Sequence, residues 1–188
     1  ELLTENGNIV AVRTERGDFS ADTYVMAMGA YSALYLKAIG VRIPVYPMKG
    51  YSVTLPANEY CPQGSIADGT HKLVYTRLGD RLRIAGTAEF AGYDDAVNDK
   101  RIAPIVRAGQ TMFPKADWTR PVEKWACLRP QTPDGPPLLG WTPYRNLFLN
   151  TGHGTLGWTQ AAGSAAIVAD IVEGKGPEIL MQGLTLVR

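Results

Sequence analysis

The sequence has few cysteines, few histidines and almost no net charge. Cys61 and Cys127 are too few for a disulfide framework, so a reduced cytoplasmic setting is the default. The 19 basic and 18 acidic residues leave a net charge of +1 without a basic run, so we expect no nucleic-acid partner. No residues are assigned to a metal site. No apolar run reaches the ~20 residues that a membrane-spanning helix needs.

The start of the chain also lacks an initiator methionine, a signal peptide and a targeting pattern. It begins with ELLTENGNIVAV, which resembles the interior of a longer protein, so we expect the chain to be a fragment. Its 188 residues are enough for one domain or two small lobes with a core. A composition of 45% hydrophobic and 20% charged residues is typical of a folded, soluble protein.

In the first quarter of the chain, the apolar pattern predicts a strand, a turn near residues 16–18 and a second strand. Ile9, Ala11 and Phe19 alternate loosely with polar residues, as on a half-buried hairpin. The run from Tyr24 to Met28 differs, because it is continuously apolar, and it is expected to be a strand buried on both faces. Ser32 is expected to cap a short helix at its N-terminus, and Gly40 follows that helix.

The rest of the chain predicts further strands and two helices. A β-hairpin is expected to turn at Gly79-Asp80, and residues 102–112 have helical spacing that tolerates Pro104 only in the first turn. Residues 129–137 are expected to form a loop because proline and glycine punctuate them. A buried strand ending at Thr151 and a helix from Gly157 are expected to follow.

Three glycines in NTGHGTLGWT, namely Gly152, Gly154 and Gly157, have the spacing of a dinucleotide-binding loop. That role requires an acidic residue about 20 positions later at the end of a strand, and Glu178 does not end an apolar strand. A pyrophosphate loop is therefore disfavoured. Two alternatives remain: an ordinary tight turn, or a loop where glycines let the backbone and a helix N-terminus approach an anionic or ring-shaped ligand.

Several segments together resemble one family. They are VMAMGAYS, PVYPMKGYSVTL, TRLGDRLRIAGTAE, LRPQTPDGPPLLG and LFLNTGHGTLGWTQAAGSAAIVADIV. They resemble the FAD-dependent D-amino acid oxidase superfamily and, within it, the catalytic subunits of D-amino acid dehydrogenases. The resemblance implies an α+β fold in which part of a Rossmann-like FAD domain, residues 1–44 and 127–188, is interleaved with an antiparallel-sheet substrate domain, residues 45–126. It also implies that an N-terminal half, with its own glycine motif, is missing.

The resemblance further implies a set of site residues. A strand end that passes close to FAD and the loop at the flavin ring correspond to Ala27, Met28, Gly29, Gly152, His153, Gly154, Thr155, Leu156 and Gly157. Arg129 corresponds to the arginine that pairs with the substrate carboxylate, a role suited to the guanidinium fork, and a surface salt bridge is the alternative. His71 stands where relatives often have an aromatic residue near the substrate, and a structural histidine is the alternative.

The implied reaction is the oxidative deamination of D-amino acids to 2-oxo acids and ammonia, by hydride transfer to flavin N5. No side chain is assigned as a catalytic base. Electrons would pass to a quinone or another carrier, with possible peripheral association of the parent enzyme at the inner membrane. The alternatives are an O2-using oxidase of the glycine or sarcosine type and an inactive fragment. Cys127 is either a covalent flavin anchor or a buried free cysteine, and Lys49 is expected to be structural or solvated.

Overall fold

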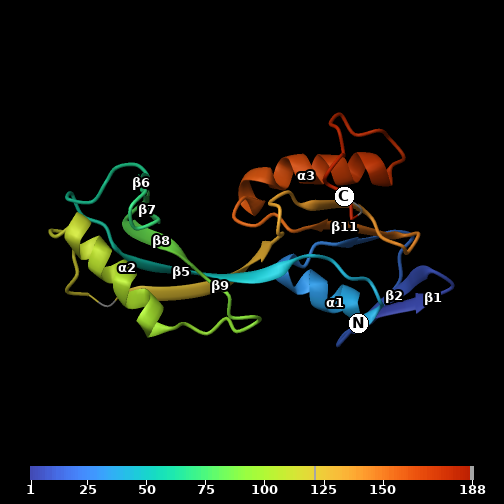
Figure 1. The fold of residues 1–188 in the computed structure, drawn as a ribbon, viewed down its shortest axis with the longest axis horizontal. Helices are drawn as coiled ribbons and strands as arrows, with labels where there is room; N and C mark the ends of the chain where they lie inside the picture. The colour runs from blue at the N-terminus through green and yellow to red at the C-terminus, as the bar shows by residue number, and fades with distance from the viewer. Residues whose placement is uncertain (121, 187–188) are drawn as a thin grey trace. The chain divides into compact units, whose positions relative to one another are not determined.

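The computed structural model describes residues 1–120 and 122–186, and the chain divides into two compact units (Figure 1). The first unit contains Glu1–Pro47 together with the chain from Arg129 onward, and the second contains Met48–Leu128. Both units combine sheets with helices, so the expected α+β class is confirmed. The assignment of residues 1–44 and 127–188 to FAD and of 45–126 to substrate stays a prediction.

The first unit begins with an antiparallel sheet of order β1-β2-β3, formed by β1 (Leu2–Glu5), β2 (Asn8–Thr14) and β3 (Gly17–Phe19). The β2–β3 hairpin agrees with the expectation from the sequence, whereas β1 was not expected. The turn between β1 and β2 is Asn6-Gly7, with φ angles of +49° and +78°. Asn-Gly is the favoured sequence for such a two-residue hairpin turn, so the signal for β1 was present in the sequence.

A second sheet of the first unit has the order β10-β11-β4, formed by β10 (Leu138–Trp141), β11 (Leu147–Thr151) and β4 (Tyr24–Met26). β11 runs antiparallel to β10 and parallel to β4. Leu147 and Leu149 point into a core with β2 and α1 (Ser32–Ala38), whereas Phe148 packs against α3 (Gly157–Val172), which lies over β10 and β11 (Figure 1). Alternation along the strand therefore gives the sheet two buried faces.

The expectation that the strand over Tyr24 to Met28 is buried on both faces is wrong. β4 ends at Met26, and Val25 is 44% exposed. β4 is the edge strand of its sheet, and its α3-facing side is not covered. The expected N-cap role of Ser32 is also wrong, because a 3-10 turn, η1 (Gly29–Tyr31), precedes α1 and makes Ser32 its first residue, with Tyr31 at the N-cap.

The second unit is a five-stranded sheet of order β6-β7-β8-β5-β9, covered on one face by α2 (Figure 1). The strands are β5 (Tyr46–Pro56), β6 (Ile66–Asp68), β7 (Leu73–Leu78), β8 (Arg81–Glu89) and β9 (Glu123–Gln131). The β7–β8 hairpin turns at Gly79-Asp80 as expected, with Gly79 at a φ of +62°. Tyr51, Val53, Tyr75, Leu82 and Ile84 form the centre of the core beneath α2.

Two expectations for this part of the chain are wrong. α2 (Asp99–Met112) begins earlier than residue 102, because the side chain of Asn98 accepts a hydrogen bond from the Lys100 amide as an N-cap, and Pro104 thus lies beyond the first turn. β9 continues to Gln131, so Arg129 lies on a strand rather than in a loop. No described helix is long and apolar enough to cross a membrane.

Candidate functional site

Two loops of the first unit leave the same edge of one sheet. β4 and β11 are parallel neighbours, with Leu149 opposite Met26, so the segments that follow them start side by side. Residues 27–29 follow β4, and residues 152–156 follow β11. In open α/β sheets, ligands bind outside the carboxyl ends of the strands. This edge is therefore the candidate site, and it brings together the segments expected to contact FAD.

The loop between β11 and α3 takes a path that only glycine follows easily. Gly152 and Gly154 have φ angles of +82° and +54°, in the left-handed region that disfavours residues with a Cβ. A Cβ on Gly152 would lie 2.8 Å from Thr132 Cγ2, and one on Gly154 would lie 2.7 Å from Gln131 Oε1. Gly152 is therefore required by both conformation and close packing, and Gly154 by its conformation.

The same loop is bound to the end of β9. The Gly154 amide donates to the Pro130 carbonyl at 2.9 Å, and Gln131 and His153 form an antiparallel bridge. Arg129, half-buried, directly precedes Pro130 on this strand. The structure thus places the segment that carries Arg129 beside the glycine loop, although the two are far apart in the sequence.

His153 anchors the loop to α3. Its Nε2 lies 2.9 Å from Ser164 Oγ, about two turns into the helix. Burial lowers the pKa of His153 below its ordinary value, which favours the neutral imidazole. A neutral ring has one donor and one acceptor nitrogen. Depending on the tautomer, Nε2 therefore either donates to the Ser164 hydroxyl or accepts from it.

The beginning of α3 provides a second feature of a ligand site. Its N-cap residue, Leu156, has no side chain that can cap the first amides, so this end of the helix can accept an anionic or electron-rich group. Among the described residues, only three buried side-chain oxygens lack a hydrogen-bond partner, and two of them, Asn150 Oδ1 and Gln160 Oε1, flank this loop. Buried polar groups usually find a partner in protein, water or ligand. These residues therefore fit a site that is completed by another group.

The exposed positions around the loop are strongly apolar. Leu156 is 51% and Met28 is 53% exposed, and the Trp158 side chain stands 95% exposed. Ala27 and Thr155 are also exposed. Along the open side of β4, a groove of about 460 Å³ is lined by Leu2, Val12, Val25, Met26, Met28 and Tyr35, among others. This unit therefore presents a large apolar surface next to the candidate site.

His71 belongs to the second unit, where it lies in the turn between β6 and β7. Its Nδ1 lies 2.6 Å from Asp68 Oδ2, and its side chain is 58% exposed. The pKa of Asp68 is lowered, first by the hydrogen bond from the His71 ring. His71 and Asp68 line a shallow depression against α2, together with Arg107, Thr111 and Met112. These contacts give His71 a structural partner within its own unit.

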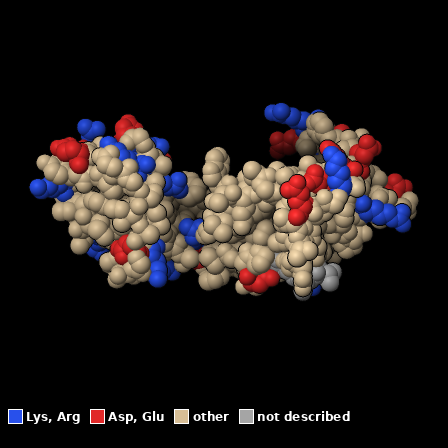
Figure 2. Space-filling model, turned by 90° about the horizontal axis from the view of Figure 1, so that it is seen from above, with Lys and Arg blue, Asp and Glu red and all other residues tan. Residues whose placement is uncertain are grey.

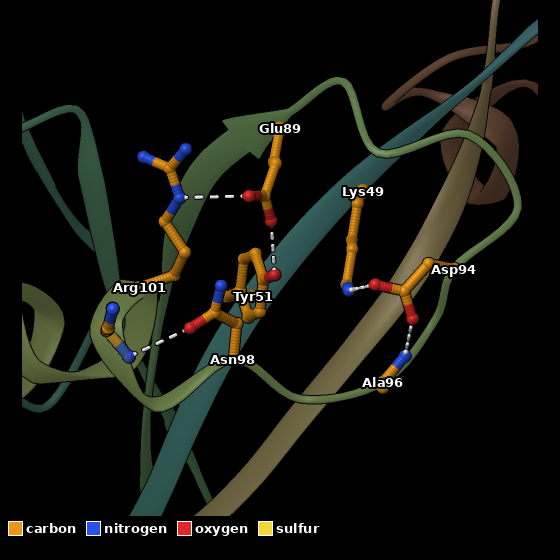
Figure 3. A network of polar contacts seen from close by, with 8 residues as sticks. Lys49, Tyr51, Glu89, Asp94, Ala96, Asn98 and Arg101 are labelled. Carbon is orange, nitrogen blue, oxygen red and sulfur yellow. Dashed lines mark hydrogen bonds and ion pairs between the residues drawn. The ribbon is translucent and has the colours of Figure 1, made fainter.

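Lys49 is buried rather than solvated. It is 1% exposed, and its Nζ lies 3.1 Å from Asp94 Oδ2 (Figure 3). Burial alone would lower the pKa of Lys49, but hydrogen bonding to Asp94 and Tyr51 outweighs it and raises the pKa. Beside this pair, the Tyr51 hydroxyl donates to Glu89, which also pairs with Arg101 of α2 (Figure 3). The network ties the segment between β8 and α2 to the sheet.

Cys127 is an exposed free thiol on β9, so the alternative of a buried cysteine is wrong. By alternation along the strand, Cys127 and Arg129 lie on the same face, opposite the buried Leu128.

On the molecular face drawn in Figure 2, basic and acidic side chains are interspersed without a continuous patch of either sign. That face therefore offers no electrostatic footprint for a polyanion.

Sequence reasoning missed Thr151, Asn150 and Gln160. Thr151 directly precedes Gly152, and its hydroxyl donates to the Gly29 carbonyl at 3.0 Å, which links the two loops. Asn150 and Gln160 flank the same loop with unpartnered oxygens. A polar pair, Asn-Thr, at the end of an otherwise apolar strand was the available signal.

Comparison with known proteins gives concordant results. The chain is 46% identical over its whole length to a D-amino acid dehydrogenase of Vibrio cholerae serotype O1, of which it covers 45%. It is 49% identical over its whole length to a D-amino acid dehydrogenase of Paramagnetospirillum magneticum, again covering 45%. Glycine oxidase from Geobacillus kaustophilus superposes on the whole chain with a TM-score of 0.87 and 28% identity, and 52% of that structure is covered.

The chain therefore spans about half the length of the curated relatives it matches. The family model of FAD dependent oxidoreductases (DAO) matches residues 1–171. This match agrees with the resemblance of the β4, β9 and glycine-loop segments, and it covers every element of the candidate site. The chain belongs to the DAO family of FAD dependent oxidoreductases.

Proposed function

We propose that this chain is part of an FAD-dependent D-amino acid dehydrogenase. The observation that carries the proposal is the meeting of three segments, residues 27–29, 129–131 and 152–157, at one sheet edge of the first unit. Identities of 46% and 49% to D-amino acid dehydrogenases support this substrate class. The activity would belong to the whole protein, because the chain matches only 45% of those relatives.

In this proposal the residues of the chain bind and orient the reactants. Residues 27–29 and 152–157 would hold the flavin end of FAD, with the N-terminus of α3 directed at the electron-rich edge of the ring. Arg129 would fix the substrate carboxylate bidentately and so set the direction of the Cα–H bond. When bound, FAD would accept the hydride of the amino acid Cα, which leaves an imino acid that water hydrolyses to a 2-oxo acid and ammonia.

His71 is kept as a proposed pocket residue, with its pairing to Asp68 as the competing structural role. The electron acceptor is proposed to be a quinone or another carrier, and the whole protein is proposed to act in the cytoplasm, peripherally at the inner membrane. The support for these finer points is the resemblance to D-amino acid dehydrogenases. Cys127 is kept as a proposed covalent anchor because it is exposed on the same strand face as Arg129.

A second candidate is an oxidase that transfers electrons to O2. The likeness to glycine oxidase, with a TM-score of 0.87 and 28% identity, favours it. Both candidates would use FAD and the same residues of this chain, so the test distinguishes them by how the reduced flavin is reoxidised.

The test uses the whole protein, purified with its flavin and mixed anaerobically with D-alanine or L-alanine. We expect bleaching of the visible absorbance of the oxidised flavin with the D isomer alone. Air is then admitted in the presence or absence of a quinone. Rapid recolouring by air with release of hydrogen peroxide would favour the oxidase, and recolouring that needs the quinone would favour the dehydrogenase. A colourless protein, or one not bleached by any amino acid, would refute both.

A further inference from the structure

Two buried hydroxyls connect the loops at the candidate site. Ser32 is fully buried and Thr151 is 1% exposed. The Ser32 hydroxyl donates to Thr151 Oγ1 at 3.1 Å, and the Thr151 hydroxyl donates to the Gly29 carbonyl at 3.0 Å. Each hydroxyl has one proton, so this direction of donation uses both protons and forms a continuous chain from α1 through β11 to residue 29.

The Gly29 carbonyl is the end point of this chain. It also accepts a hydrogen bond from the Ser32 backbone amide, so both of its lone pairs are used. Gly29 itself has a φ of +55°. Two donors on one carbonyl fix the plane of the peptide that follows Gly29, at the point where the chain turns from β4 into η1.

Thr151 is placed to transmit this constraint. It is the last residue of β11 and directly precedes Gly152, where the glycine loop begins. The backbone of Thr151 therefore sets the start of one loop, while its hydroxyl sets the orientation of the other. A ligand that touches both loops needs their relative position to be fixed to within a fraction of an ångström.

We propose that Ser32 and Thr151 are positioning residues that hold residues 27–29 and 152–157 in register and so set how tightly the flavin is bound. The inference rests on the proposed function for the flavin. The hydrogen bonds that connect the two loops are observed in the structure and do not depend on that function. They also give a role to the buried hydroxyl of Ser32, which is the first residue of α1.

The test compares four variants of the whole protein, stripped of flavin and titrated with FAD. Thr151→Val has nearly the same shape without the hydroxyl, and we expect FAD to bind on the order of tenfold more weakly, because the hydrogen bond that links the two loops is lost. Ser32→Ala should have a smaller effect, since Thr151 can still donate to Gly29. Thr151→Ser keeps the hydroxyl and should therefore retain a near-normal affinity for FAD. Adding Ser32→Ala to Thr151→Val should cost little more, because the chain is already broken.

Thr142→Val is the matched control. Thr142 is also a buried threonine of the first unit, with its hydroxyl bound to Tyr144, but it lies beyond β10 at the opposite end of β11. Its loss should lower the melting temperature without changing the FAD affinity. Amide hydrogen exchange of the flavin-free protein provides a second reading. Thr151→Val should speed exchange in residues 28–32 and 152–156, whereas Thr142→Val should not.

The outcomes separate the two claims. A wild-type protein that binds no FAD would refute the proposed function, and unchanged exchange in Thr151→Val would independently refute the coupling of the loops. A wild-type protein that binds FAD, with Thr151→Val and Thr142→Val both at wild-type affinity, would leave the hydroxyls a stability role only and overturn the inference.

Discussion

The imidazole Nε2 of His153 lies 2.9 Å from the hydroxyl of Ser164, and this contact fastens the glycine loop to α3. Burial lowers the pKa of His153 from its ordinary value of 6.5. The unfolded chain therefore takes up a proton at a higher pH than the folded chain. The stability that neutral His153 contributes to the folded state is fully present above the pKa of the unfolded chain, and it is lost as the pH falls from there through the pKa of the folded chain.

The first prediction follows from this titration. The melting temperature of the whole protein should fall as the pH is lowered from about 7 to about 5, and His153→Gln should flatten this dependence because glutamine does not titrate. Thermal melts at half-unit pH intervals measure it. His71→Gln is the control, since His71 is exposed in the other unit. A His153→Gln profile parallel to that of the wild type would contradict the prediction.

The second prediction concerns Arg129. Arg129→Ala in the whole protein should lower kcat/KM for a D-amino acid by about 2–5 kcal/mol of transition-state stabilisation, because a charge-assisted bidentate pair is lost. Arg129→Lys should recover only part of it, since an ammonium lacks the fork. Steady-state kinetics with a parallel FAD titration separate substrate from flavin binding. Arg16→Ala, on the exposed β2–β3 turn, serves as the control. A normal KM in Arg129→Ala would rule out the assigned role.

The third prediction concerns residues 1–188 expressed alone. The isolated chain should bind FAD only weakly, because the expected phosphate-binding half is not in it and a partial site forgoes most of the contacts that offset the entropy of binding. It should also self-associate through the apolar groove along β4, where Val25 is 44% exposed.

Titration calorimetry with FAD and sedimentation velocity measure these two properties. Val25→Lys should reduce self-association, whereas Val74→Lys, at a similarly exposed strand position of the second unit, should reduce it less. A sub-micromolar dissociation constant for FAD would contradict the expectation of a partial site.

The fourth prediction concerns the buried lysine. Asp94→Asn should lower the melting temperature, because it leaves the ammonium of Lys49 buried without a carboxylate. Lys49→Met in the same background should recover much of the loss, since the methionine needs no partner. Lys124 and Asp99, an exposed pair on the surface, provide the control: Lys124→Met should have little effect. If Asp94→Asn and Lys124→Met melt alike, Lys49 does not depend on Asp94.

The pKa of Asp94 adds a pH test of the same pair. The Ala96 amide and then Lys49 lower the pKa of this carboxyl, so the stability that it contributes is present above the unfolded pKa of 3.8 and is lost as the pH falls through the lower folded value. Asp94→Asn should therefore remove part of the loss of stability below about pH 4.

Local patterns in the sequence predicted the elements whose signals are local. The hairpin at Gly79-Asp80 and the helix from Gly157 are confirmed because turn residues and helical spacing lie within a few positions of each other. The start of α2 was misjudged because Asn98, its N-cap, precedes the apolar positions on which the prediction depended.

The candidate site was predictable from the residues only as a set of glycines. The parallel pairing of β4 with β11, and the bond from Gly154 to Pro130, join segments far apart in the sequence, and periodicity carries no information about such pairs. Ser32 shows the same limit: a serine before a helix is a good cap by local rules, but a tertiary contact with Thr151 determines its role.

The division of the chain into a continuous and a discontinuous unit affects its synthesis. Met48–Leu128 is one uninterrupted segment, so it can fold as soon as it leaves the ribosome. The first unit cannot, because its core joins Ile9, Met26 and Leu36 to Leu138, Leu147 and Leu149, which are made much later. Until then, β4 lacks its partner strand β11, and the core side chains of β2 and α1 lack their contacts with β10 and β11. The nascent chain therefore exposes them throughout the synthesis of the inserted unit, when a chaperone would have the longest opportunity to bind.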